Sequence, residues 1–218
     1  MNETNYFVER KPELMKFFTR LMKPGRKIIV KRYGVETGEV MINDFRSEFE
    51  SLIPEMPKIR QDDTLLERQL ILCTVYLAIY RSMKKQGKSV EDIWQLCHDI
   101  EEAMIKSIPG IIRWFAKRNI FSNKENNREI RSAKESQKHQ YPEDFVFTYV
   151  EGDGGNFDYG IDMTECAMCK FYTRMDAIEF LPYICKTDYI FSEHFGYTFI
   201  RTKTLAQGHD RCDFRFKK

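Results

Sequence analysis

The sequence lacks any apolar run long enough to cross a membrane. No uninterrupted apolar stretch approaches the roughly 20 residues that a spanning helix needs, and the first six residues lack the basic segment and apolar core of a secretory signal. An excess of one charge is also lacking, because 35 basic residues nearly balance 33 acidic ones and leave a net charge of +2. We therefore expect a cytoplasmic protein that binds neither nucleic acid nor membrane.

Phosphate-binding glycine loops and the short motifs of common hydrolases are absent as well. There is no Gly-x-Gly-x-x-Gly, no Gly-x-x-x-x-Gly-Lys-Ser/Thr, no His-Glu-x-x-His and no Gly-x-Ser-x-Gly. The acidic glycine segment 151–156 lacks the ligand spacing and terminal glutamate of a calcium loop, so we interpret it as a hairpin turn. The chain contains no internal repeat.

The composition is that of a globular domain. The 218 residues are 42% hydrophobic and 14% aromatic, which is enough for a sizeable core, and we expect a single domain over residues 1–218. Residues 1–121 carry apolar side chains at three- and four-residue spacing, which predicts a helical part. The expected helices are 11–22, closed by Pro24 and Gly25; 28–52, weakened by Gly34 and Gly38; 65–85, the central buried helix; 89–108; and 111–119.

The second half has a different texture. Residues 122–142 form a polar connector, either a solvated helix or a mobile link. Within residues 143–218, the segments 145–150 and 157–163 predict one hairpin, 167–180 and 181–193 predict two short helices, and 197–205 with 212–216 predict a second hairpin. The sequence thus predicts an α+β fold, in which a helical N-terminal half packs on one face of a C-terminal antiparallel sheet.

Four of the six cysteines lie in the last third of the chain, at Cys166, Cys169, Cys185 and Cys212. Because disulfides are rare in a reducing compartment, we interpret all six as free thiols. Cys166 lies where a strand is expected to meet a helix, and a helix N-terminus favours thiolate. If the two hairpins pair, these thiols can converge at one end of the sheet. Cys73 and Cys97, on apolar helical faces, are interpreted as small buried hydrophobes.

Such a cluster has three chemical uses, which the sequence leaves open. The first is nucleophilic catalysis, in which a thiolate attacks carbon, His194 or His209 shuttles the proton and Asp188 orients the imidazole. The second is a redox couple at the Cys-x-x-Cys, although no thioredoxin-like context surrounds it. The third is zinc, whose common modules match this spacing poorly and whose possible ligands are Cys166, Cys169, Cys185 and Cys212.

Charged residues near these cysteines are candidates for substrate binding. Arg201 lies on an expected strand and could hold a substrate carboxylate, but a solvated sheet face explains it equally well. Asp210 is adjacent to His209 in the sequence, which usually makes the two side chains point apart. His98 and His139 lie in polar surroundings, and we interpret both as solvated.

The C-terminal part resembles a known family. The residues that carry the resemblance are Cys166, the segment Leu181-Pro-Tyr-Ile-Cys-Lys-Thr-Asp188, and the segment Thr204-Leu-Ala-Gln-Gly-His-Asp-Arg-Cys-Asp-Phe-Arg-Phe216. They are similar to the L-2-amino-thiazoline-4-carboxylic acid hydrolase family, most strongly from 157 to 216, and residues 31–34 and 52–57 fit it more loosely. The closing Gly-x-x-x-Cys-x-Phe pattern is also similar to four-vinyl-reductase-type ligand-binding domains.

The resemblance implies hydrolytic opening of a cyclic isothiourea or thiazoline to an N-carbamoyl cysteine, without a cofactor. The alternative is a non-catalytic regulatory domain that binds a small molecule or a metal. As a hypothesis, the catalytic residues are Cys166, Cys185, Asp188, His194, His209 and Cys212, and the substrate-binding residues are Cys169, Arg201 and Asp210. Apolar helical faces could bury a dimer contact as readily as a core, so a homodimer also stays open.

Overall fold

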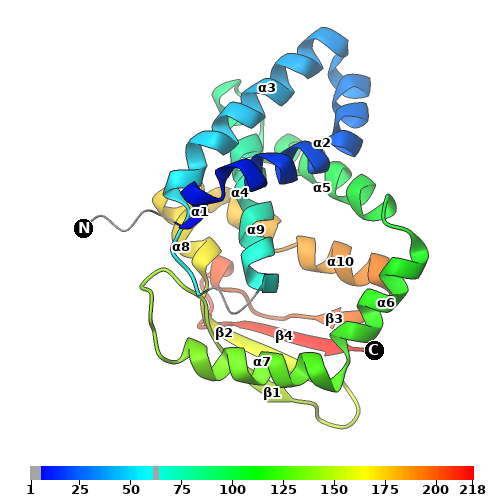
Figure 1. Ribbon diagram of the computed structural model, residues 1–218, viewed down its shortest axis with the longest axis vertical. Helices are drawn as coiled ribbons and strands as arrows, with labels where there is room; N and C mark the ends of the chain where they lie inside the picture. Colours follow the sequence, from blue (N-terminus) through cyan, green and yellow to red (C-terminus); the bar gives the residue numbers. More distant parts are fainter. Residues whose placement is uncertain (1–5, 61–63) are drawn as a thin grey trace.

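The computed structural model describes residues 6–60 and 64–218, and it confirms the α+β fold. Helices make up the first half, and a four-stranded sheet lies below them in the second (Figure 1). The first half comprises α1 (Tyr6–Glu9), α2 (Lys11–Tyr33), α3 (Val35–Leu52), the 3-10 turn η1 (Ile53–Glu55), α4 (Thr64–Lys85), α5 (Val90–Lys106) and α6 (Gly110–Ile120). The second comprises α7 (Asn123–Ser136), β1 (Val146–Glu151), β2 (Tyr159–Glu165), α8 (Ala167–Arg174), η2 (Ile178–Phe180), α9 (Leu181–Ile184), α10 (Thr187–Phe195), β3 (Thr198–Ile200), η3 (Leu205–Gln207) and β4 (Cys212–Lys217).

The first helix is longer than predicted. Helix α2 continues through Pro24 and Gly25, so the expected end at these residues is wrong. Gly25 packs against Ile100 of α5 so closely that a Cβ would lie 3.1 Å from that side chain, and this packing outweighs the helix-breaking tendency of both residues. The helix ends instead at Gly34, whose φ of +86° is a conformation that glycine adopts without strain.

Helix α4 is the central buried helix, as predicted. It packs against α3, α5 and α8, and residues on all sides of it are buried: Leu70, Ile71, Leu72, Cys73, Thr74, Val75, Tyr76, Leu77, Ala78, Ile79 and Tyr80. The Tyr172 hydroxyl of α8 donates a hydrogen bond to the carbonyl of Cys73 at 2.7 Å. This contact joins the helical half to the segment that follows the first hairpin.

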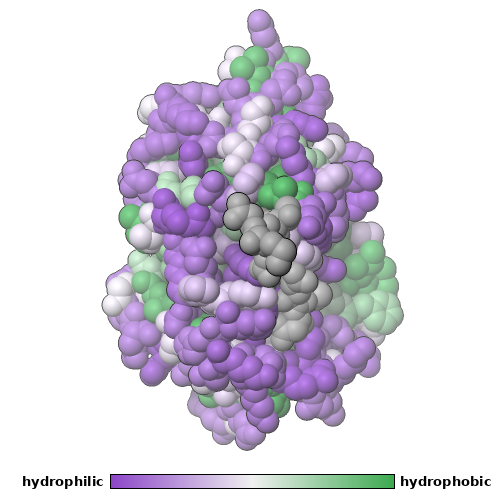
Figure 2. All heavy atoms as spheres, turned by 60° about the vertical axis from the view of Figure 1, so that its left-hand side comes forward, coloured by the Kyte–Doolittle hydropathy of each residue, from purple (hydrophilic) through white to green (hydrophobic). Residues whose placement is uncertain are grey.

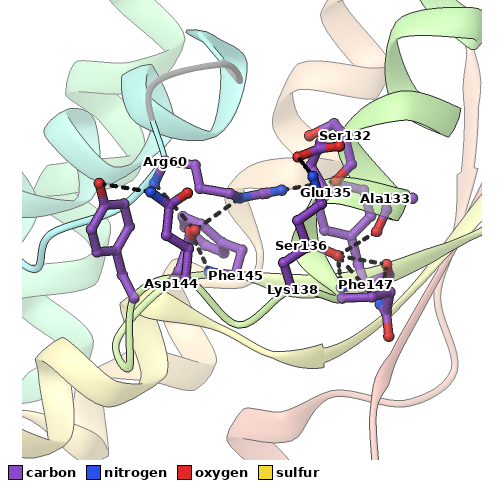
Figure 3. Close-up of polar contacts among 12 residues, drawn as sticks. Arg60, Ser132, Ala133, Glu135, Ser136, Lys138, Asp144, Phe145 and Phe147 are labelled. Atoms are coloured by element: carbon purple, nitrogen blue, oxygen red, sulfur yellow. Dashed lines mark hydrogen bonds and ion pairs between the residues drawn. The ribbon is translucent and has the colours of Figure 1, made fainter.

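The polar connector contains a helix. Ser122 caps α7 by accepting a hydrogen bond from the Glu125 N–H, and Ala133 and Ser136 on its buried face pack toward β1. The Ser136 hydroxyl donates to the Phe147 carbonyl at 2.9 Å, and the Phe147 N–H donates back to that hydroxyl at 3.1 Å (Figure 3). Of the two alternatives for residues 122–142, the helix is therefore correct for 123–136, and it is partly buried.

A buried ion pair fastens this helix to the rest of the molecule. The Arg60 Nε donates to an Asp144 carboxylate oxygen at 2.9 Å, and its Nη1 donates to the Ser132 carbonyl at the same distance (Figure 3). The Asp144 carboxylate also accepts from the N–H of Phe145 at 2.7 Å. Both charges are almost fully buried and hydrogen-bonded, so the pair fixes the entry into β1.

The sheet has one apolar and one polar face. Its strands are antiparallel in the order β1-β2-β4-β3, so the two predicted hairpins pair through β2 and β4. The register puts one set of alternating side chains on the face that packs against the helices: Phe147, Tyr149, Tyr159, Ile161, Met163, Phe199, Cys212, Phe214 and Phe216. The opposite face carries the ion pair Asp162–Arg215 at 2.8 Å.

The segment between the hairpins is more broken than predicted. The helix expected over 167–180 ends at Arg174, because Asp176 adopts a positive φ of 54° and the Ala177 N–H turns back to the Tyr172 carbonyl. The helix expected over 181–193 is divided into α9 and α10. The strand expected over 197–205 pairs only over β3, because the Asp213 carboxylate takes up the N–H groups of residues 202 and 203.

The surface is mostly hydrophilic on the face drawn in Figure 2, with smaller hydrophobic groups between the polar residues. The most exposed apolar cluster belongs to α6 and consists of Ile111, Ile112, Trp114 and Phe115. None of the helices in the described ranges combines the length and apolarity that crossing a bilayer requires.

Candidate functional site

Arg201 is the centre of the charged part of the candidate site. It follows β3, and its Nη1 lies 2.5 Å from a carboxylate oxygen of Asp188 in the first turn of α10. Its Nη2 donates to the carbonyl of Cys185 at the end of α9. The side chain is only 4% exposed, so the interpretation as part of a solvated sheet face is wrong for this residue.

Aromatic rings complete the surroundings of this arginine. The guanidinium carbon lies 5.2 to 5.4 Å from the ring centres of Tyr189, Phe199 and Phe214. A guanidinium over aromatic faces is stabilised by their quadrupoles, especially where water is excluded. Its Nε has no hydrogen-bond partner among the described residues. Arg201 thus has one N–H donor that its protein neighbours do not use.

Three cysteines from distant parts of the sequence meet near this ion pair, and we refer to Cys166, Cys185 and Cys212 as the thiol cluster. Cys166 contributes to the raised pKa of both Cys185 and Cys212, and Cys212 contributes to that of Cys185. Cys212 lies opposite Met163, three residues before Cys166, and Arg201 binds the Cys185 carbonyl, so the three segments come together as predicted.

Cys166 occupies the predicted junction between strand and helix. It is the N-cap residue of α8, and the backbone N–H groups of Met168 and Cys169 lower the pKa of its thiol. Hydrogen bonding with the Cys169 thiol and burial act more strongly in the other direction, so the pKa is raised well above the ordinary value. The expected thiolate at this helix N-terminus is not favoured.

The other two members of the thiol cluster are also kept protonated. Cys212 begins β4, and its sulfur accepts a hydrogen bond from the Leu205 N–H at 3.2 Å. Burial raises the pKa of Cys212 to about 11 despite this bond and despite Arg201. Burial raises the pKa of Cys185 further, and Arg201 opposes the effect only in part. The resting cluster consists of neutral thiols at physiological pH.

Asp188 is the carboxylate whose charge acts on the thiols of Cys185 and Cys212. Its side chain is 24% exposed. Burial raises its pKa above the ordinary value, and the charge of Arg201 and the hydrogen bond from its guanidinium oppose this effect. Asp188 can therefore accept a proton more readily than a solvated aspartate.

The two histidines lie outside this arrangement. His194, in the last turn of α10, points toward Glu102, with 3.9 Å between its Nε2 and a carboxylate oxygen. His209 and Asp210 are exposed in the loop before β4, where Asp210 pairs with Arg211 at 3.2 Å and with Lys203 at 3.8 Å. No contact joins these residues to the thiol cluster in the part of the chain that the structure describes.

The sequence interpretation missed two buried residues. Cys73, assigned to the core, is buried on α4 as expected. Burial is the main cause of its raised pKa, and Glu101, Asp188 and the thiols of Cys166 and Cys185 raise it further, so Cys73 borders the site. Glu101 of α5 is fully buried, and no charged or backbone group among the described residues donates a hydrogen bond to its carboxylate oxygens.

Burial raises the pKa of Glu101 to about 8, with a further contribution from the charge of Asp188 and an opposing one from the Tyr76 hydroxyl. A sequence signal for this residue exists, because Glu101 follows Cys97 by four positions on the apolar stripe of its helix. A carboxyl at such a position is either paired in the core or functional.

Metal binding has no geometric support in the described ranges. Within residues 6–60 and 64–218, no group of three or more His, Cys, Asp or Glu side chains is arranged to hold a metal ion. The four cysteines considered as zinc ligands are free thiols, two of them partly exposed.

Comparison with known proteins places the chain in a family. A family model described as L-2-amino-thiazoline-4-carboxylic acid hydrolase matches residues 68–216. No curated protein and no solved structure matches the chain significantly. The matched span contains the whole arrangement described above, from Cys73 on α4 to Cys212 on β4. Since the match covers well over half of the sequence, the chain belongs to the L-2-amino-thiazoline-4-carboxylic acid hydrolase family.

Proposed function

We propose that the protein hydrolyses a small cyclic isothiourea or thiazoline, such as 2-amino-thiazoline-4-carboxylate, to an N-carbamoyl cysteine. The family match supports the class of reaction. The single observation that carries the proposal is the ion pair between the buried guanidinium of Arg201 and the partly buried carboxylate of Asp188, beside the thiol cluster. It supplies a cation for a substrate carboxylate and a base for water within one interior region.

The proposed chemistry uses water as the nucleophile. The water oxygen bonds to ring carbon C2, the bond between C2 and sulfur breaks, and C2 becomes the carbonyl carbon of the carbamoyl group. For the neutral ring, one water proton ends on the ring nitrogen and the other on the leaving sulfur; for the cation, whose ring nitrogen already carries a proton, the second water proton is released. Asp188 accepts the proton from water and returns it to sulfur. The raised pKa values of Cys166, Cys185 and Cys212 make attack by a resting thiolate the less favoured route.

The thiol cluster then serves to shape the site. Neutral thiols are small, polarisable groups that pack well against a ring sulfur. Arg201 holds the substrate carboxylate through the N–H of its Nε, which has no protein partner in the described ranges. Cys169 is hydrogen-bonded to Cys166 and adds a further thiol to this side of the site.

A non-catalytic ligand-binding domain is the second candidate. The observation that favours it is the neutral state of the thiols, because binding needs no activated nucleophile. Both candidates place a small molecule in the same region, and only turnover distinguishes them.

The test is incubation of the purified protein with 2-amino-thiazoline-4-carboxylate and related rings, followed by mass spectrometry. We expect a product heavier by one water that carries a new thiol, and strongly reduced turnover in Asp188→Asn. The matched control is Asp99→Asn, because Asp99 also pairs with an arginine, Arg32, but that pair is partly exposed between α2 and α5 and touches none of the cluster thiols. Binding of these rings without any turnover would replace the hydrolase proposal with the binding domain.

A further inference from the structure

The interior contains a carboxyl, that of Glu101, which only the hydroxyl of Tyr76 approaches among the described residues. Glu101 lies on α5 where this helix packs against α4 and α10. It is fully buried, and no charged or backbone group in the described part of the chain donates a hydrogen bond to its carboxylate oxygens. The hydroxyl of Tyr76, on α4, is also fully buried, and it lies close enough to Glu101 to lower the pKa of that carboxyl by hydrogen bonding.

Such an arrangement is unfavourable for folding alone. A buried carboxyl loses its hydration, and a single neutral hydroxyl replaces only part of it. The other buried positions of α5 are filled by apolar side chains or a thiol: Ile93, Leu96, Cys97, Ile100 and Ile105. An apolar residue at position 101 would pack there without this cost, so the carboxyl is explained by a role in binding or catalysis.

Glu101 belongs to the same interior region as the candidate site. The charge of Asp188 acts on Glu101, and both carboxyls act on the Cys73 thiol, which lies on α4 near the thiol cluster. Asp188 in turn contacts Arg201 at 2.5 Å. The region therefore presents acceptor oxygens at Glu101 that only the Tyr76 hydroxyl approaches, and an N–H donor at the Arg201 Nε that has no partner among the described residues.

We propose that the two carboxylate oxygens of Glu101 bind the N–C–N group of a cyclic isothiourea, with the Tyr76 hydroxyl beside them, while Arg201 binds the carboxylate of the same molecule. This inference rests on the proposed function and specifies its substrate class. Two parallel N–H groups, one on the ring nitrogen and one on the exocyclic amine, match a carboxylate in the bidentate manner known for guanidinium. The site therefore selects small rings that carry both an amidine-type group and a carboxylate.

Binding by this contact has a proton balance that can be measured. With a pKa of about 8, Glu101 is mostly protonated at pH 7 when no ligand is bound. A cationic ligand is held best by the ionised carboxylate, so the Glu101 proton leaves to the buffer on binding. At pH 7 about 0.9 proton per site is released.

The experiment is calorimetric titration of the full chain with 2-amino-imidazoline-4-carboxylate, in two buffers of different ionisation enthalpy. This cyclic guanidine is a cation without a ring sulfur, so C–S cleavage does not occur. We expect release of close to one proton by the natural protein. Glu101→Gln should bind the probe at least tenfold more weakly and release no proton. Tyr76→Phe should also bind it more weakly, but binding should still release the proton of Glu101. The control Glu102→Gln, at the next position on α5, should match the natural protein.

Equal affinity and equal proton release in Glu101→Gln would overturn the inference. Failure of the natural protein to bind this probe while it still opens 2-amino-thiazoline-4-carboxylate would also overturn it and leave the proposed function intact. Binding with proton release but without turnover of any ring would support the site and end the hydrolase proposal.

If Glu101→Gln does not fold, the infrared carbonyl band of a protonated carboxyl decides the matter in the natural protein. That band should disappear when the probe is added, and its persistence at saturation would count against the inference.

Discussion

The buried carboxyl of Glu101 makes the stability of the folded protein depend on pH in a specific way. Its pKa is about 8 in the folded state against 4.5 when solvated. Between these values the folded state holds a proton that the unfolded chain has released, so the free energy of unfolding falls as pH rises. The contribution of this one group to that fall is about 4 kcal/mol between pH 5 and pH 9, from the linkage relation applied to the two pKa values.

The measurement is urea unfolding at intervals from pH 5 to pH 9, followed by circular dichroism, for the natural protein and Glu101→Gln. The amide does not ionise, so the variant should gain relative stability as pH rises, by about 4 kcal/mol over the whole interval. Asp188, whose pKa is also raised, contributes in the same direction in both proteins. Glu102→Gln serves as control. Parallel curves, with a difference that stays constant within about 1 kcal/mol, would refute the burial argument.

Further predictions concern the ion pair, the thiols, the core and metal content. Arg201→Met should destabilise the protein by about 3–5 kcal/mol in urea unfolding, because it leaves Asp188 without its partner, and combining it with Asp188→Leu should recover part of the loss; an additive double variant would contradict this. An alkylating reagent should label Cys169 and Cys185 of the native protein before the four buried cysteines, as mapped by mass spectrometry, and early labelling of a buried one would argue against the fold around it. Phe49→Ala should cost about 3–5 kcal/mol in thermal unfolding, since Phe49 is fully buried against Phe18, and a loss below 1 kcal/mol would mean that the site collapses. Protein purified without chelator should contain no stoichiometric zinc in elemental analysis, and a zinc content near one per chain would revive the metal alternative.

Much of the fold was accessible from sequence periodicity. The apolar stripes located α4, α5 and α6 within one or two residues, and alternation located both hairpins. Local rules failed where tertiary packing opposed them. Pro24 lies within a helix because the adjacent Gly25 allows close contact with Ile100, and no local pattern reports that contact.

The candidate site was accessible only in part. The positions of Cys166, Cys185 and Cys212 indicated a shared region, but the sequence could not reveal that burial keeps their thiols neutral. His209 was placed near the thiols because it precedes Cys212 by only three residues, but its side chain is exposed. Glu101 was missed because the apolar pattern around it is typical of a core helix. Only the three-dimensional surroundings show that no charged or backbone group in the described ranges pairs with its carboxylate oxygens.

The contact between α7 and β1 has a consequence for the behaviour of the protein at high concentration. Strand β1 is an edge of the sheet, and an open edge is a template on which another chain can add a strand and start a fibril. At Phe147 the outward N–H and C=O are already taken by the Ser136 hydroxyl, and the Gln137 amide adds a second bond to the same carbonyl at 2.9 Å. Helix α7 thus blocks the addition of another strand at this edge. Its hydroxyl and amide groups can do so because they form hydrogen bonds with the backbone of β1, which apolar side chains could not.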